Sequence, residues 1–272
     1  MEPVYFINLL FYIGTLVLFS FVISRIYQKY RERKNKTTKW LLFVLLFYAF
    51  SLSSVLINTV LEYILEVYPE PWNWGFQQAG AWYYYFQYIL QFSCLRDAMI
   101  IIANLFLILF YYELFVHEQT RLSKILFWVY TVTGVFLIAL YLVGVYLVDL
   151  LNYGYSFSLD ELIIQLTQSR NKLILLLVHT GGIFIPLLVK SLLLRYKLIQ
   201  KRKKKNVEMI RKFNFIFLMV VFYLGIYVFA LLDVLSATSY SIWFYLTFVS
   251  ESMAAVMAYF GFVRKLKNNP HK

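Results

Sequence analysis

The sequence predicts an all-α polytopic membrane protein, a seven-transmembrane-helix bundle formed by one domain over residues 1–272. Hydrophobic residues make up 61% of the chain and charged residues 15%, whereas soluble domains have about 45–50% and about 25%. The apolar residues form continuous runs that are long enough for the roughly 20-residue helix that crosses a bilayer. A barrel strand would instead alternate in polarity over about ten residues. We therefore expect a multi-pass protein of the plasma membrane.

Seven apolar runs are expected to form the spans: Val4–Ser24, Trp40–Glu62, Phe86–Phe115, Ile125–Val148, Leu173–Leu194, Phe213–Leu235 and Ile242–Val263. Twenty-two of the 26 lysines and arginines lie in the connections of one parity, and the predicted connections of the other parity contain none. Cytoplasmic connections carry this excess of basic residues in membrane proteins. The amino terminus is therefore expected outside and the carboxyl terminus in the cytoplasm, with the basic clusters against anionic headgroups.

The second and sixth runs resemble each other. Asn58 follows Tyr48 by ten residues in the second run, and Asp233 follows Tyr223 by ten residues in the sixth. Each of these two runs comes after a strongly basic connection and before an aromatic helix that opens at a tryptophan. This echo suggests that spans one to three and five to seven are parallel repeats joined by span four, an arrangement that occurs in transporters.

The third run contains the adjacent charged residues Arg96 and Asp97, and then Asn104. An ionisable residue inside a membrane helix is costly and usually faces the bundle interior, so it marks a functional site. Asp97 and Asn104 are seven residues apart and share a helix face, whereas Arg96 lies about 100° round the helix from Asp97. We expect Arg96 to pair with Asp97, Asp233 or Glu251.

The fifth and seventh runs also carry polar residues. His179 lies close to Pro186, at a weak point where freed backbone groups could line a cavity. Glu251 has nothing within its own helix to neutralise it, so it is expected to be protonated, paired with Arg96 or facing water. A stripe of small residues after Glu251 permits close helix approach: Ala254, Ala255, Ala258 and Gly261.

These residues predict a polar, partly aqueous pocket that opens to the outside and binds a small ligand. The expected ligand-binding residues are Asn58, Arg96, Asp97, Asn104, His179, Asp233 and Glu251. The alternative is a satisfied buried ion pair that only fixes the register of the helices.

Enzyme chemistry is not expected, and neither is a metal or a cofactor. Two of the three histidines, His117 and His271, are expected at the cytoplasmic edge or tail, and the remaining histidine and the one cysteine cannot form a three-ligand metal site without carboxylates. No nucleophile–base pair stands at a recognisable spacing, and there is no Gly-rich phosphate loop. The net charge of +12 is explained by the topology, so we expect no nucleic acid as partner. The densest basic cluster is expected to contact lipid or a cytoplasmic partner: Lys201, Arg202, Lys203, Lys204 and Lys205.

The chain resembles the seven-helix sensor regions that precede prokaryotic histidine kinases. In that family an aromatic run with Gln-Tyr opens the third span, as Tyr85-Phe-Gln-Tyr88 does here, and a segment rich in Phe and Tyr closes it, as Phe110–Phe115 does. The resemblance implies a receptor-like sensor. Since no residue follows Lys272, it would signal through a separate cytoplasmic partner or as a homo-oligomer. The alternatives are a small-solute or ion transporter with a three-one-three helix arrangement and a structural subunit of a membrane complex.

Overall fold

The computed structural model describes residues 3–67, 80–115, 124–125, 127–139, 169–200, 206–236 and 241–263, and this part of the chain contains helices and no strand. The long helices are α1 (Pro3–Arg33), α2 (Lys36–Val67), α4 (Gly80–Phe115), α7 (Ser169–Gln200), α8 (Asn206–Ser236) and α9 (Ile242–Phe262). A shorter apolar helix spans Phe127–Ala139. The all-α prediction is confirmed for the described residues.

Four helical segments among these residues are long and apolar enough to cross a membrane: Phe6–Arg33, Lys36–Val60, Ile210–Ser236 and Ile242–Phe262. Their outer faces expose large apolar side chains such as Val17 and Ile242, which are 64% and 69% exposed. Such faces are unfavourable in water and suit lipid. The protein is therefore a membrane protein with several apolar helices of spanning length.

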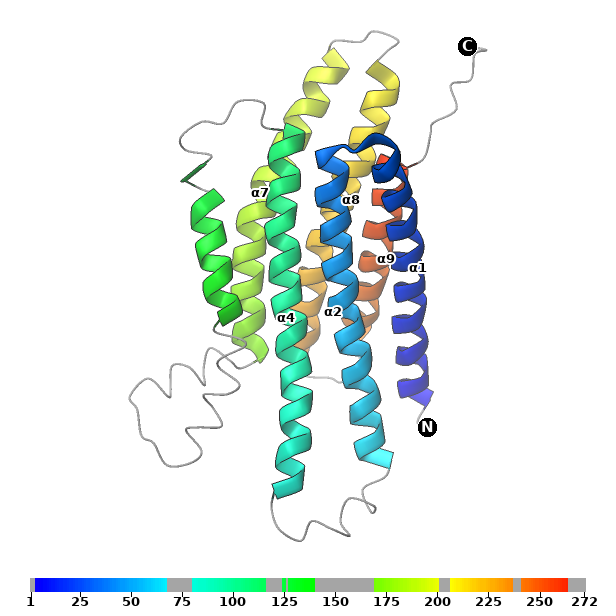
Figure 1. The fold of residues 1–272 in the computed structure, drawn as a ribbon, viewed down its shortest axis with the longest axis vertical. Coiled ribbons are helices and arrows are strands. Elements are labelled where there is room, and N and C mark those ends of the chain that lie inside the picture. The colour runs from blue at the N-terminus through cyan, green and yellow to red at the C-terminus, as the bar shows by residue number, and fades with distance from the viewer. Residues whose placement is uncertain are drawn as a thin grey trace.

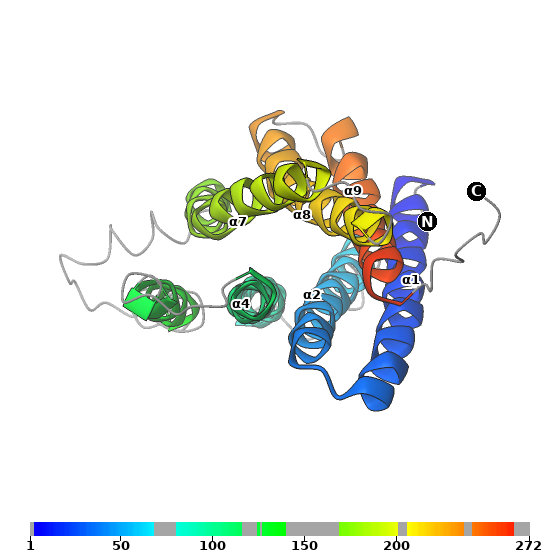
Figure 2. The same ribbon diagram turned by 90° about the horizontal axis from the view of Figure 1, so that it is seen from above.

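The long helices lie side by side, and neighbours within α1–α2–α4 and within α7–α8–α9 run in opposite directions, whereas α4 and α7 run in the same direction (Figure 1). Seen from above, α1, α2 and α4 form one row, and α7, α8 and α9 form a second row beside it (Figure 2). Within each row neighbouring helices pack together, and across the rows α1 packs on α9 and α4 packs on α7. Exchanging the triplet α1–α2–α4 with α7–α8–α9 maps each of these packed pairs onto another packed pair. This is the packing expected of the parallel repeats that the sequence suggests.

The turn between α1 and α2 lies at the same end of the bundle as the carboxyl end of α7 and the amino end of α8 (Figure 1). We call this the basic end, because it carries the described part of the main basic clusters, Arg25–Lys39, Arg195, Lys197, Arg211 and Lys212. The opposite end is not free of basic residues. Helix α7 begins at Ser169, earlier than expected, which places Arg170 and Lys172 at that end.

The buried residues of helix α1 form one narrow stripe. They recur at alternating intervals of four and three: Asn8, Tyr12, Thr15, Phe19, Val22, Ile26 and Lys29. This spacing keeps one seam facing its neighbours, as in left-handed helix packing. The helix ends at Lys34, which has a positive φ of 47° and donates its N–H to the Tyr30 carbonyl at 2.7 Å. Asn35 then caps α2, since its Oδ1 accepts the Thr37 N–H at 3.0 Å.

Apolar side chains fill the half of the bundle nearer the basic end. The buried cluster there includes Phe19, Val22, Ile26, Leu41, Val44, Leu45, Leu107, Phe110, Met219 and Val220. Ala254, Ala255 and Ala258 of α9 are buried in the same cluster. A Cβ added at Gly261 would lie 3.5 Å from Ile216 and 3.6 Å from Phe215, both on α8. The small-residue stripe of α9 thus allows close packing in this half of the bundle.

Candidate functional site

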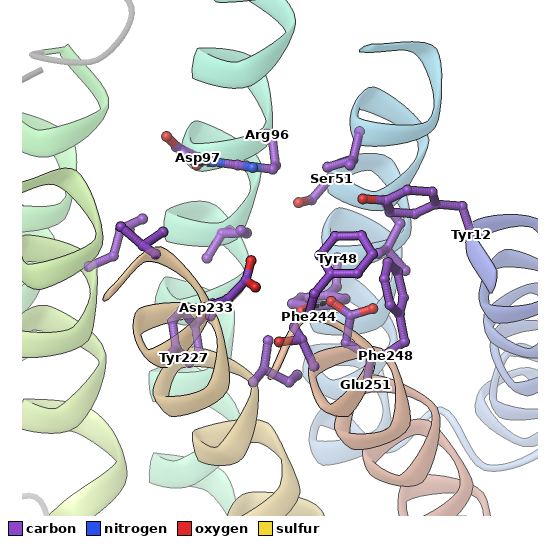
Figure 3. Close-up of a pocket in the computed structure, with 18 residues that line it drawn as sticks. Tyr12, Tyr48, Ser51, Arg96, Asp97, Tyr227, Asp233, Phe244, Phe248 and Glu251 are labelled. Atoms are coloured by element: carbon purple, nitrogen blue, oxygen red, sulfur yellow. Dashed lines mark hydrogen bonds and ion pairs between the residues drawn. The ribbon is translucent and has the colours of Figure 1, made fainter. Parts of the chain in front are cut away.

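A cavity of about 370 Å³ lies between the two rows of helices, in the half away from the basic end (Figure 3). All six long helices contribute residues to its wall. The charged residues of the wall are Arg96, Asp97, Asp233 and Glu251. Four of the seven residues that the sequence proposes as ligand-binding are therefore brought together around one space.

Arg96 pairs with its own neighbour in the chain. Its Nε and Nη2 both lie 2.9 Å from Oδ1 of Asp97. Asp97 keeps 1% of its side-chain surface exposed and Arg96 keeps 38%. Removing a carboxylate from water without a partner is costly, so the guanidinium stabilises Asp97 in place. Of the three pairings expected for Arg96, the one with Asp97 is confirmed.

Glu251 is only half satisfied. Its residue is 6% exposed, and its Oε1 accepts the Tyr48 hydroxyl of α2 at 3.0 Å. Its Oε2 is buried and has no hydrogen-bond partner among the described residues. Buried polar atoms are normally bonded, so an orphan oxygen on a cavity wall calls for a proton, a water or a ligand group. Figure 3 shows the Glu251 carboxyl group directed into the cavity from α9.

Asp233 lines the cavity and also fixes the junction of α8 and α9. Its Oδ1 accepts the Ser241 hydroxyl at 2.6 Å. Ser241 is the N-cap of α9, because its Oγ accepts the Trp243 N–H at 3.2 Å. The position of the Asp233 carboxylate is thus set by the start of the next helix.

Five aromatic rings complete the wall: Tyr12, Tyr48, Tyr227, Phe244 and Phe248. Phe244, Phe248 and Glu251 recur at i, i+4 and i+7, so one face of α9 presents both rings and the carboxyl group. Tyr12 packs edge-on against Phe248, with the ring centroids 4.7 Å apart. The sequence analysis did not assign these rings to the site. The available signal was a tyrosine deep in an apolar run, whose hydroxyl needs a partner when buried.

Asn104 lies nearer the basic end and does not line the cavity. It is fully buried, donates to the Thr180 hydroxyl at 3.0 Å and accepts the Tyr227 hydroxyl at 3.3 Å. Asn104 therefore joins α4, α7 and α8. The bond from Tyr227 to Asn104 resembles the bond from Tyr48 to Glu251. In each, a tyrosine on the middle helix of one triplet donates to a polar residue on the last helix of the other.

His179 and Asn58 also stand apart from the cavity wall. The Nε2 of His179 lies 3.3 Å from the Tyr130 carbonyl, and the Tyr130 hydroxyl donates to the Gly182 carbonyl at 2.6 Å. Pro186, four residues later, has no N–H to offer that carbonyl. The freed backbone group that was expected to line a cavity is therefore bonded to a neighbouring helix. His179 contributes to helix packing, and its position gives no support to a role in ligand binding.

The described residues contain no group of three His, Cys, Asp or Glu side chains placed to hold a metal ion. The basic cluster Lys201–Lys205 and the last part of the fourth expected span, residues 140–148, lie outside the described residues. Comparison of the chain with protein-family models, with curated proteins and with solved structures gives no match. The class defined by the fold and the cavity is an all-helical membrane protein with a polar space between two helix triplets.

Proposed function

We propose that the protein is a receptor-like sensor with seven transmembrane helices and an outside amino terminus, which binds a small ligand in this cavity. The observation that carries the proposal is the meeting of Arg96, Asp97, Asp233 and Glu251 around a space of about 370 Å³. Ligand pockets have volumes of about 300–1,000 Å³ and apolar walls with a few polar groups. The orphan Oε2 of Glu251 gives the ligand a group to engage.

The floor of the cavity supports a route for a signal. The ring of Tyr48 stacks on Phe19 of α1 at 5.5 Å and contacts Tyr223 of α8 at 5.4 Å between centroids. A ligand that engages Glu251 draws the carboxyl group toward itself, which weakens the bond from the Tyr48 hydroxyl to Oε1 and moves this ring. Because Tyr48 touches both triplets, the displacement changes how they pack. In the proposed function this change reaches the basic end, where a separate cytoplasmic partner receives it.

A transporter is the second candidate, and the two exchangeable helix triplets favour it. In transporters built from parallel repeats the substrate site lies between the repeats, as this cavity does. The apolar cluster beyond Tyr48 would then close the path to the basic end. A transporter must open that path, whereas a sensor keeps it closed.

The decisive experiment uses the full chain in nanodiscs and in liposomes. A panel of small cations, anions and neutral solutes is screened by thermal unfolding with the wild type and Glu251→Gln. A ligand of the cavity present at 100 times its Kd is expected to raise Tm by about 5 °C in the wild type and by less in the variant. Liposomes loaded with the same ligand then measure flux.

Each combination of stabilisation and flux supports one of the candidate functions. Stabilisation without flux supports the sensor, and stabilisation with flux that Glu251→Gln abolishes supports the transporter. If no solute of any charge class stabilises the wild type, a structural subunit of a membrane complex is the better account.

A further inference from the structure

The walls of the cavity carry an excess of negative charge. Three carboxyl groups line it, those of Asp97, Asp233 and Glu251, and one guanidinium, that of Arg96. If all four are ionised, the formal charge is two negative units. If Glu251 is protonated, one negative unit remains. The sign of the excess therefore does not depend on the state of Glu251.

The positive and negative groups are also placed differently. Arg96 is bonded to Asp97, so part of its charge is already balanced at 2.9 Å. Asp233 and Glu251 are held by neutral hydroxyl groups, those of Ser241 and Tyr48, and neither forms an ion pair with a described lysine or arginine. A carboxylate that keeps only neutral donors attracts a cation more strongly than one already paired. Figure 3 shows the side chains of Asp233 and Glu251 entering the cavity from α8 and α9.

The remaining walls suit an organic cation better than a bare ion. The rings of Tyr12, Tyr48, Tyr227, Phe244 and Phe248 line the same space, and aromatic faces attract ammonium groups. Aliphatic side chains such as Leu52, Ile100 and Leu176 complete the wall and suit an apolar body. The described residues offer no cluster of three ligands for a metal.

From the charge excess, the orphan oxygen of Glu251 and the aromatic walls, we infer that the ligand is a small organic cation, an amine in its ammonium form or a quaternary ammonium. Its charged group lies between Asp233 and Glu251, and its apolar part lies against Phe244 and Phe248. The inference rests on the proposed function, since it names the ligand class of the same cavity.

The test compares three probes of similar size and different charge: benzyltrimethylammonium, phenylacetate and benzyl alcohol. Their affinities for the full chain are measured by calorimetry in nanodiscs of zwitterionic lipid, with empty nanodiscs as blank. We expect the cation to bind at least about tenfold more tightly than the other two, because its fixed positive charge is attracted by the carboxyl groups of the wall, and a tenfold difference needs about 1.4 kcal/mol of added attraction. A permanent cation is used so that its charge does not change with pH.

Three variants test whether the cation binds in the cavity. Asp233→Asn and Glu251→Gln keep the shape of the side chain and an acceptor oxygen, and each is expected to weaken the cation about tenfold. Glu113→Gln removes an exposed carboxylate of the same helix as Arg96, outside the cavity, and should leave the affinity unchanged. The Tm of each variant without ligand shows that the fold is retained.

The inference is overturned if phenylacetate or benzyl alcohol binds as tightly as the cation, or if both cavity variants bind it as the wild type does. It is also overturned if the cation fails to bind while the broader solute panel yields an anionic or neutral ligand that requires Glu251. In that case the proposed ligand-binding function stands. If nothing in either set binds, the function and the inference fail together.

Discussion

At the scale of single residues, the site depends on how Glu251 is held. The Tyr48 hydroxyl is the hydrogen-bond partner that the described residues give its carboxyl group, through Oε1. A buried polar atom that loses its partner costs more than the bond itself contributed. Tyr48 therefore stabilises the buried carboxyl group of Glu251. We expect the effects of substituting Tyr48 and Glu251 on the free energy of unfolding to be non-additive.

Tyr48→Phe is expected to lower the free energy of unfolding by about 1–3 kcal/mol, because both oxygens of Glu251 are then without a described donor. Unfolding of the detergent-solubilised protein measures the effect. The same substitution in a Glu251→Leu background should cost less than about 1 kcal/mol, since the orphaned group is gone. Equal costs in the two backgrounds would show that the hydroxyl does not support Glu251.

The charged residues of the cavity were predictable and its aromatic residues were not. Arg96, Asp97, Asp233 and Glu251 stand out in the sequence because each is costly inside an apolar helix. Tyrosine carries no such cost, and the chain has 24 of them. Which tyrosine finds a buried partner depends on the helix across the cavity, and this packing cannot be inferred from one sequence.

At the scale of helices, α7 is shaped by one proline and one glycine. The Gly182 carbonyl, released by Pro186, accepts the Tyr130 hydroxyl, and the absence of a Cβ makes room for that ring. The sequence analysis recognised the weak point in this helix but assigned it to a cavity. The outcome differs because a freed carbonyl accepts any donor that helix packing brings within reach, and here that donor is the Tyr130 hydroxyl.

Gly182→Ala is expected to destabilise the protein by about 1–3 kcal/mol, because the new Cβ would clash with the Tyr130 ring. Gly181→Ala is the matched control. A Cβ there meets only the end of Ile185 at 4.0 Å, so the change should be neutral or stabilising by up to about 1 kcal/mol through helix propensity. Similar Tm values for the two variants would contradict the close contact at Gly182.

The carbonyl of Gly182 gives a second prediction for α7. Tyr130→Phe should cost about 1 kcal/mol in the natural chain. In a Pro186→Ala background the cost should fall toward zero, because residue 186 then supplies the N–H that Gly182 lacks. A double-mutant cycle on unfolding free energies measures the difference. If Tyr130→Phe costs the same in both backgrounds, the hydroxyl does not replace the missing backbone bond.

The apolar runs of the sequence predicted the positions of the long helices, but most of these helices are longer than the runs. Five of the six long helices contain one whole expected span, and α9 contains all but the last residue of its span. However, α1 continues from residue 24 to Arg33, and α4 begins at Gly80 instead of Phe86. Apolar runs mark the part of a helix that faces lipid or core. They do not mark the polar turns beyond it, which are held by caps such as Asn35.

At the scale of the whole molecule, the helix directions place the residues that line the cavity in the half of the bundle away from the described basic clusters. The proposed orientation, with the amino terminus outside, rests on the excess of basic residues that cytoplasmic connections carry. Arg170 and Lys172 oppose this trend but are few beside the seven basic residues of Arg25–Lys39.

Cysteine labelling in intact cells tests this orientation. In a Cys94→Ser background, Thr247→Cys on the cavity wall should react with an impermeant maleimide from outside, whereas Ala255→Cys, which is fully buried on the same helix, should not. Lys36→Cys, at the basic end, should react only after the membrane is permeabilised. Labelling of Lys36→Cys in intact cells would reverse the proposed topology.

The stripe on α1 links the binding space to the lipid bilayer. The buried residues of α1 form one stripe, which includes Tyr12 on the cavity wall and Phe19 stacked on Tyr48. The rest of the helix exposes large apolar side chains such as Leu10 and Val17, which suit lipid. Bilayer thickness and lateral pressure thus act on an element that holds both a wall and a floor of the binding space, so ligand affinity should vary with lipid composition.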